Sequence, residues 1–129
     1  MLYDIRHRLP TERDFLATKM PYPVDTAKLA RVRAMMKDQG LTALVCRAPD
    51  NIVYLSNYWC MKGYDAVVFP AEGEPTLCVI EPQQADAART AWTKDIRLFR
   101  GYDERDPRPP QMRCLDLALG VLRERGLGE

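Results

Sequence analysis

The sequence predicts an α/β fold, in which a mixed sheet lies between helices within a single domain. Short apolar runs alternate along the chain with longer segments whose apolar residues recur at helical spacing. Two of these runs are separated only by residues 70–75, which predicts an antiparallel hairpin. The length of 129 residues is that of one domain. Alternation of helices and strands with one hairpin indicates a mixed sheet covered by helices.

The first helix is predicted over residues 27–39, with Asp25 or Thr26 as its N-terminal cap. Gly40 is expected to end it, because glycine adopts the left-handed conformation at little cost. One face of this helix is apolar and is expected to pack on the core; it carries Leu29, Val32 and Met36.

The continuous apolar run 43–46 predicts a strand buried on both faces, which ends before Pro49. A short helix follows, capped by Asp50 and continuing through Leu55. Asn57 stands where the chain must turn, and asparagine tolerates a positive φ better than most other residues. We therefore expect a turn at Asn57.

The hairpin strands are residues 66–69 and 76–80, and 96–99 is expected to be a half-exposed strand. Pro82 is predicted to open a helix, because its missing N–H costs nothing there. The predicted apolar face of that helix comprises Ala85, Ala88 and Trp92. A last helix is predicted from Pro110 to Arg125, before Gly126, with an apolar face formed by Met112, Leu115, Leu119 and Leu122.

Composition and charge argue against several functional classes. The net charge is +1 and basic residues are interleaved with acidic ones, which argues against a nucleic-acid-binding face. No segment has the run of about 20 apolar residues that a membrane span needs. No secretory signal is visible, so we predict a cytoplasmic protein with reduced cysteines.

Residues able to perform catalysis are scarce. The one histidine, His7, has charged neighbours and lies in a predicted N-terminal arm, so a solvated role is favoured over a catalytic one. Asp103, Glu104 and Asp106 alternate with arginines, which indicates a solvated loop. We therefore predict no catalytic residue and no metal ligand in this chain.

Residues 28–59 combine a helix with spaced arginines, a glycine, an apolar strand and a Pro-x-Asn-Ile-x-Tyr-Leu-Ser segment. This order resembles the amino-terminal domain of the creatinase/prolidase family, which includes Xaa-Pro aminopeptidases and dipeptidases. The motif falls on Arg31, Arg33, Met36, Gly40, Pro49, Asn51, Ile52, Tyr54, Leu55, Ser56 and Tyr58. The family usually has glycine where this chain has Asn57, and asparagine is the least costly replacement at positive φ.

The resemblance implies a ribonuclease-H-like fold, with an arm over residues 1–23 and the domain itself over residues 24–129. It implies a non-catalytic domain of a larger hydrolase, whose separate carboxy-terminal pita-bread domain, absent here, binds two divalent metal ions such as manganese. It also implies packing against that catalytic domain, homodimer formation and a role in gating the active site. The substrate of the complete enzyme stays open between Xaa-Pro peptides, creatine-like compounds and ectoine-derived amides.

The loop that follows the motif is where we expect contact with the active site. Tyr58, Trp59 and Tyr64 are candidates to form the wall of a pocket, and Lys62 is a candidate to pair with a substrate carboxylate. The alternative is that Tyr58 and Trp59 belong to the core or to a domain interface and that Lys62 is solvated.

Two other functions remain open at this stage. In the first, the chain is a stand-alone binding module whose contact surface is a sheet edge or the aromatic loop. A weaker alternative is an enzyme with Cys60 as its nucleophile, although no base is placed to activate the thiol.

Overall fold

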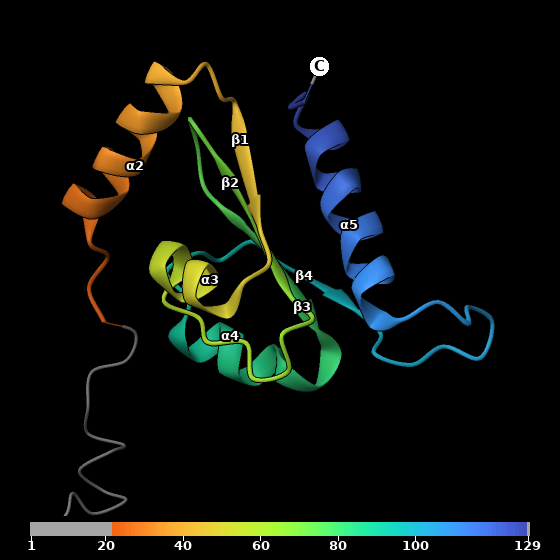
Figure 1. The fold of residues 1–129 in the computed structure, drawn as a ribbon. Helices are drawn as coiled ribbons and strands as arrows, with labels where there is room; N and C mark the ends of the chain where they lie inside the picture. The colour runs from red at the N-terminus through yellow and green to blue at the C-terminus, as the bar shows by residue number, and fades with distance from the viewer. Residues whose placement is uncertain (1–21, 129) are drawn as a thin grey trace, which may run out of the picture.

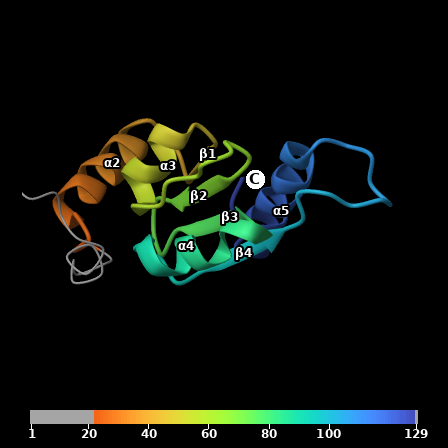
Figure 2. The same cartoon turned by 90° about the horizontal axis from the view of Figure 1, so that it is seen from below.

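The computed structural model describes residues 22–128, so the predictions for His7 and for the arm up to residue 21 lie outside the described residues. A four-stranded sheet is covered on one face by α2, α3 and α4 and on the other by α5 (Figures 1 and 2). The predicted α/β class is therefore confirmed; the ribonuclease-H-like name stays a prediction. The elements are α2 (Thr26–Asp38), β1 (Ala43–Cys46), α3 (Pro49–Ser56), β2 (Ala66–Pro70), β3 (Thr76–Ile80), the 3₁₀ turn η1 (Glu81–Gln83), α4 (Gln84–Thr90), β4 (Ile96–Phe99) and α5 (Pro110–Glu124).

The strands lie in the order β1-β2-β3-β4. β1 and β3 each pair antiparallel with β2, whereas β4 runs parallel to β3. The hairpin predicted from the short connection 70–75 is thus present, and the sheet is mixed as predicted. The parallel pair requires a crossover connection, which η1 and α4 provide.

The core has two halves, one on each face of the sheet. Val67, Phe69, Leu77 and Val79 point toward α2, α3 and α4. Their alternate neighbours point toward α5 and include Ala66, Val68, Cys78 and Ile80. Both β2 and β3 are therefore buried on both faces, which accounts for their continuous apolar sequences.

The ends of α2 confirm the prediction. The Asp25 carboxylate accepts a hydrogen bond from the Lys28 N–H at 3.0 Å and caps the helix. Gly40 has a φ of 68°, and the Leu41 N–H donates to the Met36 carbonyl at 2.8 Å, as expected for a glycine-terminated helix. The buried face is formed by Leu29, Val32 and Met36, as predicted.

β1 differs from its prediction as a strand buried on both faces. It lies at the edge of the sheet, and Val45 keeps 39% of its surface exposed, whereas its cross-strand partner Val68 is buried. The apolar run suggested a central strand, but α5 covers this sheet face over β2 and less well over β1.

The predicted faces of two helices are wrong in part: Leu122 and Trp92 pack against the core as predicted, and the other predicted residues do not. In α5 the buried residues are Cys114, Ala118 and Val121, while Met112 and Leu119 of the predicted face are exposed. α5 has apolar residues around more than half of its circumference, so periodicity alone could not select the buried face. In the α4 region the buried residues are Gln83, Ala87 and Ala91, whereas the predicted Ala85 and Ala88 are exposed and Trp92 is half-buried.

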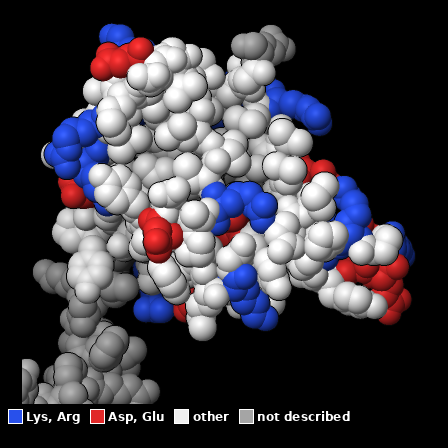
Figure 3. All heavy atoms as spheres, viewed as in Figure 1, with Lys and Arg blue, Asp and Glu red and all other residues white. Residues whose placement is uncertain are grey.

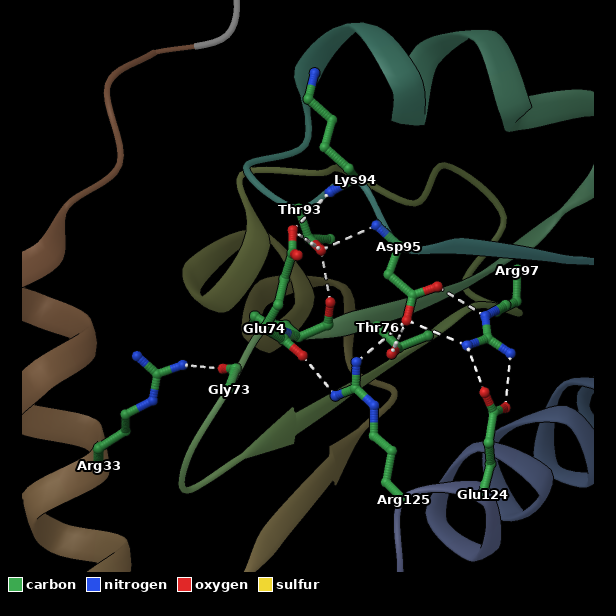
Figure 4. Close-up of polar contacts among 11 residues, drawn as sticks. Arg33, Gly73, Glu74, Thr76, Thr93, Lys94, Asp95, Arg97, Glu124 and Arg125 are labelled. Carbon is green, nitrogen blue, oxygen red and sulfur yellow. Dashed lines mark hydrogen bonds and ion pairs between the residues drawn. The ribbon is translucent and has the colours of Figure 1, made fainter.

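Charged side chains of both signs are scattered over the face shown in Figure 3, in its middle as well as at its margins. A network of such side chains joins the hairpin turn, β4 and the end of α5 (Figure 4). Arg97 donates to Asp95 at 2.7 Å and to Glu124 at 2.9 Å, and Arg125 donates to Asp95 at 3.2 Å. The Glu74 carboxylate accepts the Lys94 N–H at 2.9 Å. Because its charges are paired internally, this network fixes the arrangement of the elements rather than forming a binding site.

α2 is attached to the same hairpin by Arg33, one of the spaced arginines. Its guanidinium donates to the Gly73 carbonyl at 2.7 Å and lies 4.8 Å from the centre of the Phe69 ring. The contact explains the motif arginine in structural terms. Within residues 22–128, no helix is long and apolar enough to cross a membrane.

Candidate functional site

The sequence motif lies on α3 and at its end. Pro49 occupies the first turn, where its missing N–H is not needed, and Asn51 is exposed. Tyr54 is half-exposed, and the Lys28 ammonium lies 4.3 Å from the centre of its ring. The motif therefore begins a short helix whose buried side holds Ile52 and Leu55 against the core.

Asn57 ends α3 in the left-handed conformation, with a φ of 61°, which confirms the predicted turn. Its side-chain Nδ2 donates to the Thr90 carbonyl at 2.9 Å. Beside it, the Trp92 N–H donates to the Ser56 carbonyl at 2.9 Å. Asn57 thus turns the chain and, together with Ser56, attaches the end of α3 to the end of α4.

A buried hydrogen bond closes the base of the following loop, residues 58–65. The Tyr58 hydroxyl donates to Asp65 Oδ2 at 2.6 Å, and the Ile80 N–H donates to Asp65 Oδ1 at 3.1 Å. Both side chains are fully buried. Burial raises the pKa of Asp65 and, with the hydrogen bond to Asp65, also raises the pKa of Tyr58.

The tip of the loop points outward from this base. Trp59 is 54% exposed and Met61 is 74% exposed, while Cys60 between them is buried. Lys62 is exposed, and Gly63 has a φ of 69°, a conformation that glycine adopts without steric cost. The loop therefore combines an anchored base with an aromatic, a thioether and a cationic side chain on its outer side.

Two hollows lie beside the loop. One, of about 660 Å³, is lined by Lys62 and Tyr64 together with Glu81, Arg100 and Tyr102. The other, of about 280 Å³, is formed with α4 and is lined by Trp59, Met61, Asp86 and Arg89. The outer side chains of the loop thus line two different hollows, Lys62 and Tyr64 the larger one and Trp59 and Met61 the smaller one.

Comparison with known proteins identifies the motif and its loop as parts of a known domain. The family model described as the creatinase/prolidase N-terminal domain matches residues 28–119. The chain belongs to this family. The match includes α3, Asn57 and the whole loop 58–65, so the creatinase/prolidase N-terminal domain contains the candidate site in full.

Ectoine hydrolase of Halomonas elongata is 30% identical to this chain over 105 residues, which are 79% of this chain and 26% of that enzyme. This creatinase/prolidase N-terminal domain therefore spans about a quarter of the length of that relative.

Solved structures of two peptidases share the fold. The N-terminal domain of the cytoplasmic peptidase PepQ from Mycobacterium tuberculosis has a TM-score of 0.62 at 19% identity, over 79% of this chain and 68% of that chain. The Xaa-Pro aminopeptidase from Streptococcus thermophilus has a TM-score of 0.54 at 18% identity, over 78% and 67%. At these identities the similarity is evidence for the fold alone.

The structure separates the four residues predicted for the loop of this creatinase/prolidase N-terminal domain. Lys62 and Tyr64 share the larger hollow, and Trp59 lines the smaller one. The side chain of Tyr58 is buried and packs in the core, and the residue also borders the smaller hollow beside Trp59, so its place in a pocket wall stays a prediction. Of the motif residues, Pro49 and Asn57 shape the backbone, whereas Asn51 and Tyr54 reach the surface.

Sequence reasoning missed the residues that complete the larger hollow. Tyr102 is 78% exposed and Arg100 lies 3.8 Å from Glu81, and all three line the hollow with Lys62. Arg100 and Tyr102 are about 40 residues from Lys62 in the sequence, and no motif connects them. Only the packing of the β4–α5 loop against loop 58–65 brings them together.

Cys60 and Asp106, the other residues considered for a chemical role, have structural roles in this domain. Cys60 is buried, and burial raises the pKa of its thiol, so it is not placed to attack a substrate. Asp106 pairs with Arg108 at 2.8 Å, which holds the pKa of that carboxyl below its usual range. Among residues 22–128, no group of three or more His, Cys, Asp or Glu side chains is arranged to hold a metal ion.

Proposed function

We propose that this chain is the non-catalytic amino-terminal domain of a metal-dependent creatinase/prolidase-family hydrolase, and that loop 58–65 helps to gate the active site of the complete enzyme. One observation carries the gating proposal: the buried Tyr58–Asp65 bond fixes the base of the loop, while Trp59 and Lys62 project from its tip. A loop with a fixed base and an exposed tip is suited to orienting a substrate that is bound in the active site of another domain. The homodimer implied by the resemblance and the cytoplasmic location predicted because no secretory signal is visible are parts of this proposal.

The two divalent metal ions expected of the complete enzyme do not fit the residues described here. The carboxylates of this domain are paired with arginines, as in the Asp95 network, or are dispersed, and the described part of the chain offers no ligand cluster. We therefore derive no catalytic step from this domain. Its contribution would be contact and orientation, with Lys62 meeting a substrate carboxylate and Trp59 limiting the space for side chains.

An Xaa-Pro dipeptide is the substrate class we favour for the complete enzyme. The ectoine hydrolase similarity keeps an ectoine-type substrate as the competing class. Both classes rest on relatives, and no residue of this chain selects between them.

The decisive experiment compares the 129-residue chain with the product of its full reading frame, assayed with an Xaa-Pro dipeptide and manganese. We expect metal binding and cleavage from a longer product and neither from this chain alone. Cleavage of ectoine but not of the dipeptide would show that the substrate class is ectoine-type rather than Xaa-Pro. A reading frame ending at Glu129, or activity of this chain alone, would remove the proposal of a separate catalytic domain.

The gating role has its own test in the longer product. Lys62→Ala is expected to lower kcat/KM for the dipeptide about fivefold, the effect of losing one partly solvated ion pair of about 1 kcal/mol. Lys94→Ala is the matched control, because Lys94 is also exposed but lies near the start of β3, whereas the base of the loop contacts Ile80 at the end of β3. Equal effects of the two substitutions would contradict gating by Lys62.

A stand-alone binding module is the second candidate, favoured by the exposure of Trp59 and Met61. Large exposed apolar side chains on one loop are typical of protein contact sites. In that case the reading frame ends without a catalytic domain, and Trp59→Ala abolishes binding of the partner while the fold is retained.

A further inference from the structure

The outer edge of β1 is an open sheet edge within the described residues. Among residues 22–128, the sheet begins at β1, and β2 is the one strand that pairs with it. An edge strand presents N–H and C=O groups that another extended chain can pair with. The edge can therefore pair with an added strand, and the side chains next to the edge determine which side chains that strand must carry.

Two side chains of this edge face α5. Leu44 and Cys46 pack against the core under α2 and α3, so Val45 lies on the α5 face. Arg47 directly follows the strand, and the register continued by one residue places it beside Ala66, which packs against α5. Burial raises the pKa of the α5 thiol Cys114 to about 12, and Arg47 lies close enough for its charge to oppose that rise. Val45 and Arg47 therefore form an apolar–cationic pair, two positions apart, beside α5.

Arg47 lacks a protein partner in the described part of the chain. Its Nε atom is buried without a hydrogen-bond acceptor, and none of the ion pairs found among residues 22–128 includes Arg47. A half-buried guanidinium with an unsatisfied N–H is costly to leave unpaired. The chemistry that satisfies it best is a carboxylate, which accepts two parallel N–H bonds from arginine.

α5 supplies an apolar wall beside this edge. Arg113 and Glu124 lie on the side of α5 that contacts Gly101 and Arg97, at and after β4. The opposite side of α5 is therefore turned toward β1; it carries the exposed Met112 and Leu119, together with Leu115. Figure 3 shows uncharged side chains over the upper part of the area between β1 and α5, and charged side chains at its lower end, where β1 ends.

We propose that the β1 edge binds an extended segment of a partner protein by strand addition, and that this segment places an apolar side chain beside Val45 and a carboxylate beside Arg47. Because side chains on one face of a strand recur every second residue, the partner segment carries its apolar and acidic residues two positions apart. The exposed apolar side of α5 covers the added strand. This surface borders the base of loop 58–65, because Cys46 pairs with Val67 and Arg47 therefore lies near Asp65 and Ala66, but it does not include the loop-tip residues Trp59 and Lys62. The inference does not depend on the proposed function.

The test uses the ¹⁵N-labelled 129-residue chain and the blocked peptide acetyl-Val-Thr-Glu-Thr-Val-amide, which presents the spacing in either strand direction. The comparison peptide has glutamine in place of glutamate. We expect amide shifts confined to residues 43–47 and to α5, with about tenfold tighter binding of the glutamate peptide. Arg47→Gln should remove that preference, whereas Arg31→Gln, on the exposed side of α2, should preserve it.

Val45→Asp gives a second readout if Arg47→Gln does not fold. Position 45 is already 39% exposed, so the aspartate is tolerated there, and its charge should repel the glutamate peptide. The proposal is overturned by equal binding of the two peptides, by shifts outside the β1 edge and α5, or by an absence of binding. It is also overturned if sedimentation shows a dimer that Val45→Asp dissociates, because a second copy would then occupy the edge.

Discussion

The side chains of loop 58–65 divide by burial rather than by chemical type. Tyr58 and Trp59 are adjacent aromatic residues, yet Tyr58 is fully buried and Trp59 is 54% exposed. A buried tyrosine needs a partner for its hydroxyl, and Asp65 provides it at 2.6 Å. At the scale of residues, Tyr58 and Asp65 therefore hold the loop, and Trp59 and Lys62 are the side chains available for contact.

Tyr58→Phe tests whether the buried hydrogen bond holds the loop. The substitution keeps the ring but leaves Asp65 Oδ2 without a donor, so we expect the free energy of unfolding to fall by about 1–3 kcal/mol. Urea denaturation measures the change. Tyr54→Phe is the control, because Tyr54 is half-exposed and its ring contact with Lys28 survives, and it should change stability by less than about 0.5 kcal/mol. Equal stability of Tyr58→Phe and the wild type would contradict the anchoring role.

At the scale of elements, caps and turns proved easier to predict than faces. Asp25, Gly40 and Asn57 act through local backbone geometry, and all three were found where the sequence indicated. The cap predicted at Asp50 was wrong, because α3 starts earlier, at Pro49, with Ala48 as its N-cap and no side-chain cap. The buried faces of α4 and α5 were mispredicted in part, because each helix offers apolar residues on more than one side. Which side is buried depends on the sheet beneath, and the sheet is not encoded within the helix.

Substitutions at Asn57 separate its two contributions. Asn57→Gly should lose only the bond to the Thr90 carbonyl, at a cost of about 1 kcal/mol. Asn57→Ala should lose that bond, and the left-handed conformation should lower the free energy of unfolding by about 1–2 kcal/mol more. We therefore expect the melting temperature to fall in the order wild type, glycine, alanine. An alanine variant as stable as the glycine variant would show that positive φ is not needed at this position.

At the scale of the whole molecule, the network around Asp95 joins segments distant in sequence. Burial by itself raises the pKa of Asp95, but hydrogen bonds from Arg97 and Thr76 outweigh burial and hold the pKa below its ordinary value of 3.8. A lowered pKa in the folded state means that the ionised carboxylate stabilises the fold above pH 3.8. This contribution is lost as the pH falls below that value.

Asp95→Asn should therefore reduce stability by about 1–2 kcal/mol at neutral pH, because Arg97 and Arg125 lose a charged acceptor. The difference from the wild type should persist down to about pH 3.8, the ordinary value for the carboxyl, and shrink as the pH is lowered further toward the folded-state pKa. Denaturant unfolding at a series of pH values measures it. Asp103→Asn is the control, since an asparagine oxygen can still accept the Arg105 N–H. A pH-independent difference for Asp95→Asn would contradict the ionic contribution.

The sequence by itself determined the order of helices and strands, the hairpin, the turn at Asn57 and the family. These features depend on residues that are adjacent or a few positions apart, such as the short connection 70–75 and the cap at Asp25. Only the tertiary structure decided that β1 is an edge strand, that Tyr58 is buried, and that Lys62 shares a hollow with Arg100 and Tyr102. The reason is physical: burial and long-range contact depend on how the helices cover the sheet, and the residues that decide this lie far apart in the chain.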